Sequence, residues 1–235
     1  MKITFLTMCP QDYDSFLKTP VIRRAAEKCI CSFEVKDIRP YAGGSFRHID
    51  DSPYGGGAGM IMRAGPLLDA LAEVQQADSH TVVLAPAGCL YTQKKAREYA
   101  EKDHLILIAG HYEGIDARVY EKADELVSVG DYIVTGGELP SMLIADSVVR
   151  LLDGVLRKAS TDDESFENGL LEYPQYTKPQ EVHGMKVPDV LLSGNHGAIE
   201  AWRKEQSLRL TEKNRPDLYE KYLTAQKNLT GDGQE

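Results

Sequence analysis

Three short glycine-bearing segments of this chain follow apolar runs and carry groups that could hold a ligand. They span residues 85–88 (APAG), 109–114 (AGHYEG) and 130–140 (GDYIVTGGELP). None of them has the GxGxxG spacing of a dinucleotide site or the GK[ST] ending of a phosphate-binding loop. Residues 130–140 contain no Lys or Arg that could neutralise a phosphate. One such segment alone is typical of a tight turn, but the three together indicate a ligand without phosphates, such as a nucleoside, held by backbone groups and apolar walls.

The elements that must position these segments alternate along the chain. Short apolar runs predict strands, and apolar residues at helical spacing predict helices. We expect strands at 2–8, 31–39, 81–85, 105–109 and 125–130, and helices at 21–29, 65–76, 92–102, 115–123 and 139–154. This alternation predicts an α/β fold with a mostly parallel sheet covered on both faces. Ligands of such sheets bind at the carboxyl ends of the strands, where the three segments lie.

The pattern changes after residue 157. Residues up to about 178 are acidic and polar without a regular period, and two amphipathic helices are expected after them, at 196–213 and 215–228. A chain of 235 residues is long enough for one larger domain and a small one. We therefore expect an α/β domain over residues 1–158, a linker over 159–178 and a helical domain over 179–235.

The charge balance limits the partners that the chain can hold. The net charge of −9 argues against a protein that binds nucleic acid by bulk electrostatics alone. Residues 195–227, however, carry seven Lys or Arg against five Asp or Glu. An RNA-binding role would require these basic residues to gather on one surface.

Other features of the sequence favour an ordinary intracellular protein. No apolar run approaches membrane-spanning length, and the first residues turn polar too soon for a signal peptide, so a cytoplasmic location is expected. The four cysteines, at 9, 29, 31 and 89, have no second pair or histidine at metal-ligand spacing. We therefore expect reduced thiols and no metal site.

Six longer motifs resemble the bacterial tRNA (guanine-N1)-methyltransferase family (TrmD family), which belongs to the knotted SPOUT class. They are long, occur in the family's order and extend over essentially the whole chain: PYGGGAGM (53–60), HYEGIDARV (111–119), GDYIVTGGELP (130–140), DSVVR (146–150), SFENGLLEYPQYTKP (165–179) and VPDVLLSGNH (187–196). The resemblance implies methyl transfer from S-adenosyl-L-methionine to N1 of guanosine-37 of tRNA, immediately 3′ of the anticodon. It also implies a SPOUT-type parallel sheet with a deep trefoil knot, a small C-terminal all-α domain that binds tRNA, and a homodimer whose active site uses both subunits.

Methylation of guanine N1 requires two kinds of catalytic group. N1 must lose its proton to a general base, and the negative charge that develops at O6 must be stabilised. The resemblance places the base at Glu164 in the linker, where the family has an aspartate; Asp163 is the alternative if the loop shifts, although the motif at 165–171 favours Glu164. The resemblance gives the O6-stabilising role to Arg150. From their pattern alone, these residues are typical of a solvated linker and a helix-end cation.

The resemblance also assigns the binding residues. Glu113 would face the ammonium or sulfonium of the cofactor, whereas His111 and Ala85 depart from the arginine and serine that the family usually has. The cofactor-binding residues it implies are Leu84, Ala85, Pro86, Gly110, Tyr112, Glu113, Val129, Gly130, Tyr132, Ile133, Val134, Gly136, Gly137 and Pro140. Two groups of residues are expected to bind RNA. The first group matches the family and consists of Asp50, Gly55, Gly56, Gly57 and Gly59. The second consists of basic residues of one amphipathic helix: Arg203, Lys204, Arg209 and Lys213.

Two alternative functions remain open from the sequence. One is a knotted RNA methyltransferase that acts on another base or on a ribose 2′-OH. The other is a nucleoside-binding module without catalysis, which the change from Asp to Glu at position 164 makes conceivable.

Overall fold

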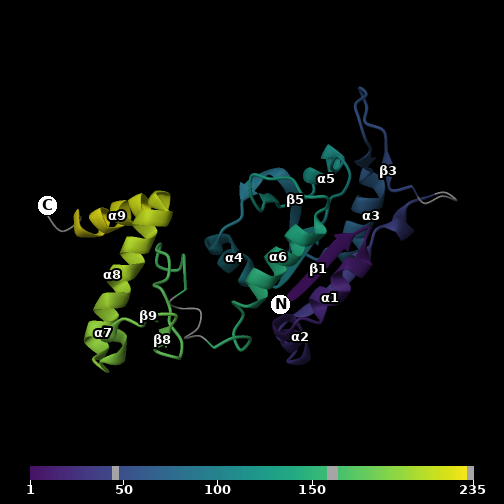
Figure 1. Ribbon diagram of the computed structural model, residues 1–235. Helices are drawn as coiled ribbons and strands as arrows, with labels where there is room; N and C mark the ends of the chain where they lie inside the picture. The colour runs from purple at the N-terminus through teal and green to yellow at the C-terminus, as the bar shows by residue number, and fades with distance from the viewer. Residues whose placement is uncertain (44–47, 158–163, 232–235) are drawn as a thin grey trace. The chain divides into compact units, whose positions relative to one another are not determined.

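Five parallel strands form the central sheet of the protein (Figure 1). They are β1 (Lys2–Thr7), β2 (Ser32–Asp37), β5 (Ser79–Leu90), β6 (His104–Ile108) and β7 (Glu125–Ser128). Their order in the sheet is β2-β1-β6-β5-β7, and every neighbouring pair is parallel. The α/β fold with a parallel sheet, predicted from the alternation of strands and helices, is therefore confirmed.

The computed structural model describes residues 1–43, 48–157 and 164–231. The chain divides into two units, Met1–Arg157 and Lys158–Glu235, which are called here the N-terminal and the C-terminal unit. Each unit is described by itself.

Helices cover both faces of the sheet in the N-terminal unit. The longer ones are α2 (Pro20–Glu27), α3 (Ala64–Val74), α4 (Gln93–Ala100) and α6 (Glu138–Val149). The shorter elements are η1 (Pro10–Tyr13), α1 (Asp14–Leu17), η2 (Arg39–Tyr41), α5 (Ala117–Tyr120) and the antiparallel pair β3 (Asp50–Asp51) and β4 (Ile61–Met62).

The apolar core lies in two layers because neighbouring residues of a strand point to opposite faces. On one face, Leu105 and Leu107 of β6 pack with residues of α2, α4 and α6. On the other face, Ile106 and Ile108 pack with α3. All four side chains are fully buried. A strand that is buried on both faces reads as a continuous apolar run, which is why LILIA was recognisable.

Strand β5 and helix α5 differ most from the sequence-based expectation, α6 ends at Val149 rather than at residue 154, and η1, α1, η2, β3 and β4 were not predicted. Strand β5 extends to Leu90, through the segment 85–88 that was expected to be a loop. Its pairing with β7 shifts between Leu84 and Cys89. Residues 85–88 therefore form a bulge at the carboxyl end of the sheet, and none of them has a partner residue in β7. Helix α5 covers only Ala117–Tyr120, because Ile115 instead pairs with Met62 of β4.

The described residues of the C-terminal unit form three helices: α7 (Asp189–Leu192), α8 (His196–Asn214) and α9 (Pro216–Gly231). Asn195 caps α8 by accepting a hydrogen bond from the N–H of Ala198 at 3.1 Å, a role that asparagine commonly takes at a helix start. A short antiparallel pair, β8 (Glu181–Val182) with β9 (Met185–Lys186), was not predicted. Across the described ranges of the chain, no helix is long and apolar enough to cross a membrane.

Candidate functional site

A cavity of about 330 Å³ opens at the carboxyl ends of β5, β6 and β7. Its walls come from the three glycine-bearing segments that the sequence singled out. All of the residues expected to bind a cofactor line it: Leu84, Ala85, Pro86, Gly110, Tyr112, Glu113, Val129, Gly130, Tyr132, Ile133, Val134, Gly136, Gly137 and Pro140. The structure therefore brings this predicted set together in one place.

Sequence reasoning missed several other residues of the lining. These are His111, Gly114, Ile115, Tyr120, Val127, Ser128 and Thr135. His111, Gly114 and Thr135 belong to the segments that were identified and could have been included on that ground, and Ser128 and Val127 lie in the strand just before the third segment. Ile115 and Tyr120 follow the second segment, and only the pairing of Ile115 with β4 brings that stretch to the cavity.

Close backbone contacts hold the three segments against one another. The N–H of Gly137 donates to the carbonyl of Gly110 at 2.7 Å, and His111 pairs with Gly136 in an isolated antiparallel bridge. A Cβ atom on Gly137 would lie 2.6 Å from the Cα of Ala109 and from the N of Gly110. Glycine is therefore required at position 137 for space, since its φ of −79° suits any residue.

The rim of the cavity contains exposed apolar side chains and one unusual backbone conformation. Ile133 is 79% exposed and Tyr132 57% exposed. Tyr112 has a φ of 60°, a left-handed conformation that is uncommon outside glycine and often marks functional sites. Burial, followed by the nearby charge of Asp50, raises the pKa of Tyr112 above its ordinary value.

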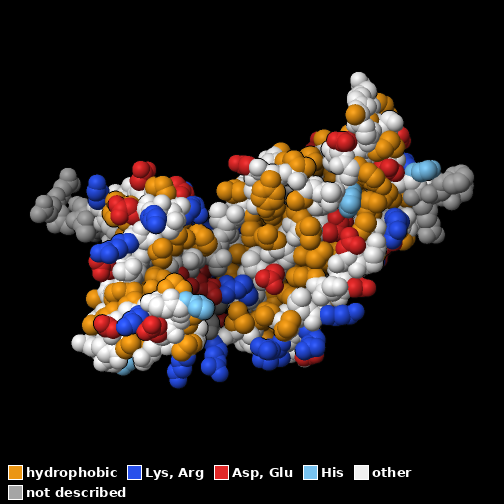
Figure 2. Space-filling view, in the orientation of Figure 1, with side chains coloured by type: hydrophobic (Ala, Val, Ile, Leu, Met, Phe, Trp, Pro, Cys, Tyr) orange, Lys and Arg blue, Asp and Glu red, His pale blue; other side chains and the backbone are white. Residues whose placement is uncertain are grey.

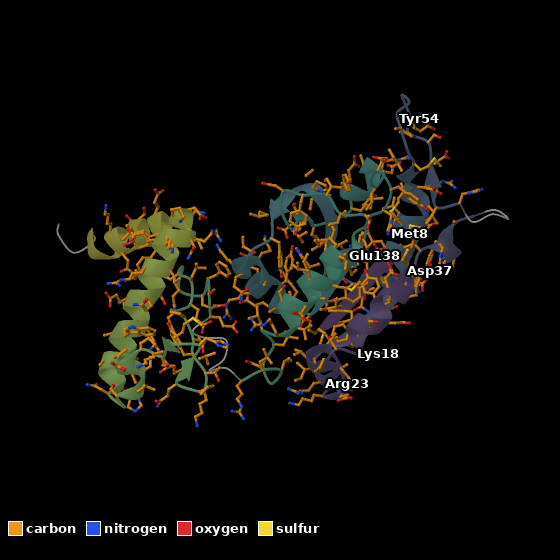
Figure 3. All side chains as sticks on the ribbon, viewed as in Figure 1. Met8, Lys18, Arg23, Asp37, Tyr54 and Glu138 are labelled. Carbon is orange, nitrogen blue, oxygen red and sulfur yellow. The ribbon has the colours of Figure 1, made fainter. Side chains whose placement is uncertain are left out.

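A buried polar cluster lies beside the cavity. Glu138, labelled in Figure 3 at the start of α6, is 4% exposed. One of its carboxylate oxygens accepts a hydrogen bond from Oγ1 of Thr7 at 2.6 Å, and the other lies 3.0 Å from Nε2 of His111. The histidine that stands where arginine is usual thus has a specific partner. Burial first, and then the charge of Glu138, raise the pKa of the neighbouring Cys9 thiol.

The first group of predicted RNA-binding residues lies next to the cavity. Asp50 is in β3, and the loop that follows carries Tyr54 fully exposed (Figure 3). The glycines of this loop all have positive φ, a conformation that side chains rarely adopt: Gly55, Gly56, Gly57 and Gly59. A Cβ on Gly59 would lie 2.4 Å from the side chain of Glu113, and the N–H of Glu113 donates to the carbonyl of Met60 at 3.0 Å. The loop therefore contacts a residue that lines the cavity.

The second group of predicted RNA-binding residues lies on α8 in the C-terminal unit. Arg203, Lys204, Arg209 and Lys213 are all exposed. The guanidinium of Arg203 stacks 4.7 Å from the ring centroid of Tyr173, and Arg209 forms an ion pair with Glu205 at 2.6 Å. Of these four exposed residues of one helix, Arg203 is thus held partly against an aromatic ring and Arg209 is paired with a carboxylate.

The two predicted catalytic residues belong to different units. Arg150 is the C-cap of α6 and is half-buried. Glu164, also half-buried, lines a cavity of about 470 Å³ in the C-terminal unit together with Arg203, Lys204 and other residues. Asp163, the alternative base, lies outside the described residues.

The sequence of the chain is similar to those of known proteins over nearly its full length. The family model described as tRNA (Guanine-1)-methyltransferase TrmD matches residues 1–221. Among curated proteins named tRNA (guanine-N(1)-)-methyltransferase, that of Halalkalibacterium halodurans is 50% identical, covering 94% of this chain and 92% of its own. That of Listeria monocytogenes is 47% identical with 98% and 96% covered, and that of Mycoplasmopsis agalactiae is 46% identical with 94% and 98% covered. With a match over nearly its full length to both the family model and these relatives, the chain belongs to the tRNA (guanine-1)-methyltransferase TrmD family.

Proposed function

We propose that this protein is an enzyme that transfers a methyl group from S-adenosyl-L-methionine to N1 of guanosine-37 in tRNA, immediately 3′ of the anticodon. The observation that carries the proposal is the cavity at the ends of β5, β6 and β7, whose lining contains every residue that the family resemblance assigned to the methyl donor. Membership of the methyltransferase family supplies the reaction type.

The chemistry of the lining fits this donor. Among the described residues that line the cavity there is no Lys or Arg to pair with a phosphate. Backbone N–H and C=O groups of the bulged segments suit the edge of an adenine, and Leu84, Val127 and Ile133 offer apolar walls for its faces. Glu113 provides the carboxylate that an ammonium or sulfonium requires.

The reaction needs a base and a cation around the guanine. We assign proton removal from N1 to Glu164 and stabilisation of the charge at O6 to Arg150. Arginine suits this role because it stays charged and offers several donors in a planar fork. With the acceptor nitrogen held in line with the methyl carbon, much of the rate comes from positioning alone.

The RNA is recognised by two surfaces in this proposal. The loop that follows β3 contacts Glu113 at the cavity and is suited to hold a guanine taken out of its stack. The exposed cations of α8 contact phosphates. Because the net charge of the chain is −9, binding depends on these few local cations.

A homodimer is part of the proposal. Exposed apolar side chains gather on α6 and on the segment before it, where Leu139 is 66% and Leu143 46% exposed beside Tyr132 and Ile133. Figure 2 shows apolar side chains on the surface of the N-terminal unit in this region. A surface patch of this kind is typical of an interface, and a second copy of the chain is the occupant that the family resemblance implies.

The proposal also includes the trefoil path and a C-terminal tRNA-binding domain. After β7, the chain returns to the loop that follows β6, where Gly137 bonds to Gly110 and Gly136 pairs with His111. It then enters α6, which packs on the same face as α2 and α4. A return to the end of an earlier strand is one requirement of a trefoil, and it supports this otherwise rare topology.

The reaction is tested with radiolabelled S-adenosyl-L-methionine and two tRNA transcripts that differ only in G or A immediately 3′ of the anticodon. We expect label in the G transcript alone, recovered as 1-methylguanosine after nuclease digestion. Methylation of both transcripts would favour a different base or the ribose 2′-OH. Donor binding without methylation of either would favour a module that only binds.

A first variant tests the donor cavity. In Gly137→Ala, the added Cβ would meet the backbone of Ala109 and Gly110 at 2.6 Å, and backbone cannot move aside as a flexible side chain does. Overpacking of this kind costs about 1–3 kcal/mol, so we expect calorimetry to show donor binding weakened by about 5- to 150-fold. The matched control is Gly65→Ala in α3, whose Cβ would meet no atom within 4 Å. If both variants bound the donor with equal affinity, the cavity would not be the donor-binding site.

A second variant tests the O6 assignment. We expect Arg150→Ala to lower kcat by about 100-fold, the usual effect of losing one donor to a developing oxyanion. Because Arg150 also ends α6, its charge contributes about 0.3–1 kcal/mol to helix stability. Arg150→Lys keeps that charge but not the planar fork, so it should restore the melting temperature and leave kcat low. A lysine variant with wild-type kcat would reduce Arg150 to a helix-end cation.

A further inference from the structure

Three side chains with metal-binding atoms meet beside the donor cavity. Cys9 follows β1, His111 follows β6 and Glu138 begins α6. Their thiol sulfur, ring nitrogen and carboxylate oxygen all lie within 4.8 Å of one another. From this arrangement we propose a site for a borderline transition-metal ion, Zn²⁺ in the first place, which is separate from the methyl-donor chemistry.

The ligand types select this class of ion. Cysteine, histidine and carboxylate are the three protein ligands of zinc, whereas Mg²⁺ prefers oxygen alone. A thiolate, a carboxylate and a neutral imidazole together carry a charge of −2, which one divalent cation neutralises. Bond lengths to zinc of about 2.0–2.3 Å put tetrahedral ligand atoms about 3.3–3.8 Å apart. The separation of 3.0 Å between Nε2 of His111 and Oε2 of Glu138 is slightly below that range, so these two atoms must part by a few tenths of an ångström. The thiol sulfur of Cys9 lies within 4.8 Å of both and must move inward by up to about 1 Å to reach a zinc ion.

The surroundings of the cluster resemble a supported metal site. Thr7 donates from Oγ1 to Glu138 at 2.6 Å and accepts from the backbone N–H of Cys9 at 2.9 Å, so one hydroxyl orients the carboxylate ligand and holds the backbone that carries the thiol. Partners of this kind fix the direction of ligand side chains. Gly136 lies against the other side, where a Cβ would stand 2.5 Å from both Nε2 of His111 and Oε2 of Glu138. Glycine therefore leaves room at the two ligand atoms.

The bound ion would join three segments that are distant in sequence. His111 lines the donor cavity, and α6 begins at Glu138, directly after Gly136 and Gly137 of the lining. Three protein ligands leave a fourth position of a tetrahedral ion for water. Zinc at this point would fasten the loops after β1 and β6 to the start of α6.

The test measures metal binding and does not use methyl transfer, so its failure is distinct from failure of the proposed reaction. The full chain is stripped with a chelator under a non-thiol reductant, and Zn²⁺ is titrated against a chromophoric competitor. We expect one Zn²⁺ per chain. Cys9→Ser and Glu138→Gln should each bind at least about tenfold more weakly. The control is the Cys29→Ser/Cys89→Ser double variant, which removes two exposed thiols outside the cluster and should bind as the wild type does.

Cobalt gives a second readout that a general loss of folding would not imitate. Co²⁺ added to the wild type and to the double variant should produce the near-ultraviolet absorption of a thiolate–cobalt bond, and Cys9→Ser with an unchanged circular dichroism spectrum should lack it. Mg²⁺ in excess should not displace Zn²⁺. The site is disproved if the stripped wild type takes up no stoichiometric Zn²⁺, if Cys9→Ser retains the cobalt band, or if Mg²⁺ competes.

Discussion

Glu164→Gln is expected to lower kcat by about 10²–10⁴-fold, the usual effect of removing a general base. Glutamine has nearly the shape of glutamate but cannot take the proton from N1 of guanine. The described residues that line the donor cavity all belong to the N-terminal unit, so calorimetry should show unchanged binding of S-adenosyl-L-methionine. A variant that loses turnover and keeps the donor separates a catalytic role from a structural one.

Two companion variants make this prediction specific to Glu164. Asp163→Asn should retain near-normal kcat; the reverse result, with activity lost in Asp163→Asn and kept in Glu164→Gln, would place the base one residue earlier. Glu164→Asp restores the residue that is usual in the family but shortens the side chain by one methylene. Since the loop of this protein carries glutamate, we expect the aspartate variant to be active and its kcat to report how well the backbone adapts to the shorter acid.

Local patterns in the sequence were sufficient to predict the sheet. LILIA is an unbroken apolar run, because both faces of β6 are covered, and no tertiary information is needed to recognise it. The lining of the cavity was predictable for a related reason: in a parallel sheet the carboxyl ends of neighbouring strands meet at one edge, so unusual segments after those strands must converge. The three segments do so in the structure.

Features that depend on contacts between distant residues were not predictable in this way. The bulge in β5 arises where its pairing with β7 shifts, and the sequence at 85–88 indicates only a turn. Ile115 reaches the cavity because it pairs with Met62. His111 looks like a simple replacement of arginine until its 3.0 Å contact with Glu138 is seen. Strands β8 and β9 have two residues each, which is too short for a periodic pattern to be detected in the sequence.

The proposed metal site at Cys9, His111 and Glu138 also depends on contacts between distant residues. Spacing rules for metal sites compare cysteines and histidines that are near one another in sequence, so they led to the expectation of no metal site and could not reveal a set drawn from residues 9, 111 and 138. The three ligand types around Cys9 come together only because β1 and β6 are neighbours in the sheet and α6 begins beside their ends. A site of this kind is visible only in the folded chain.

Mixing two inactive variants is expected to restore activity if the active site uses both subunits. In a mixed dimer, one subunit carries Gly137→Ala and the other carries Glu164→Gln. The donor cavity of the Glu164→Gln subunit is intact, and the Gly137→Ala subunit opposite it supplies an intact Glu164. Random exchange makes about half of the dimers mixed, each with one working site out of two, so we expect about a quarter of wild-type activity. The donor is held well below its wild-type Kd, where the rate of Gly137→Ala alone falls by its full loss of donor affinity.

The alternative arrangement gives an opposite result. If each Glu164 served the cavity of its own chain, every site in the mixed dimer would carry one of the two defects, and mixing would restore nothing. A covalently linked pair, with the two variants fused in one polypeptide, controls for failure of the subunits to exchange. The matched linked pair carries both substitutions in one half and neither in the other, so its intact cavity and its intact Glu164 belong to the same chain. Recovery in the first linked pair and loss of activity in the matched pair would assign the carboxylate to the neighbouring subunit.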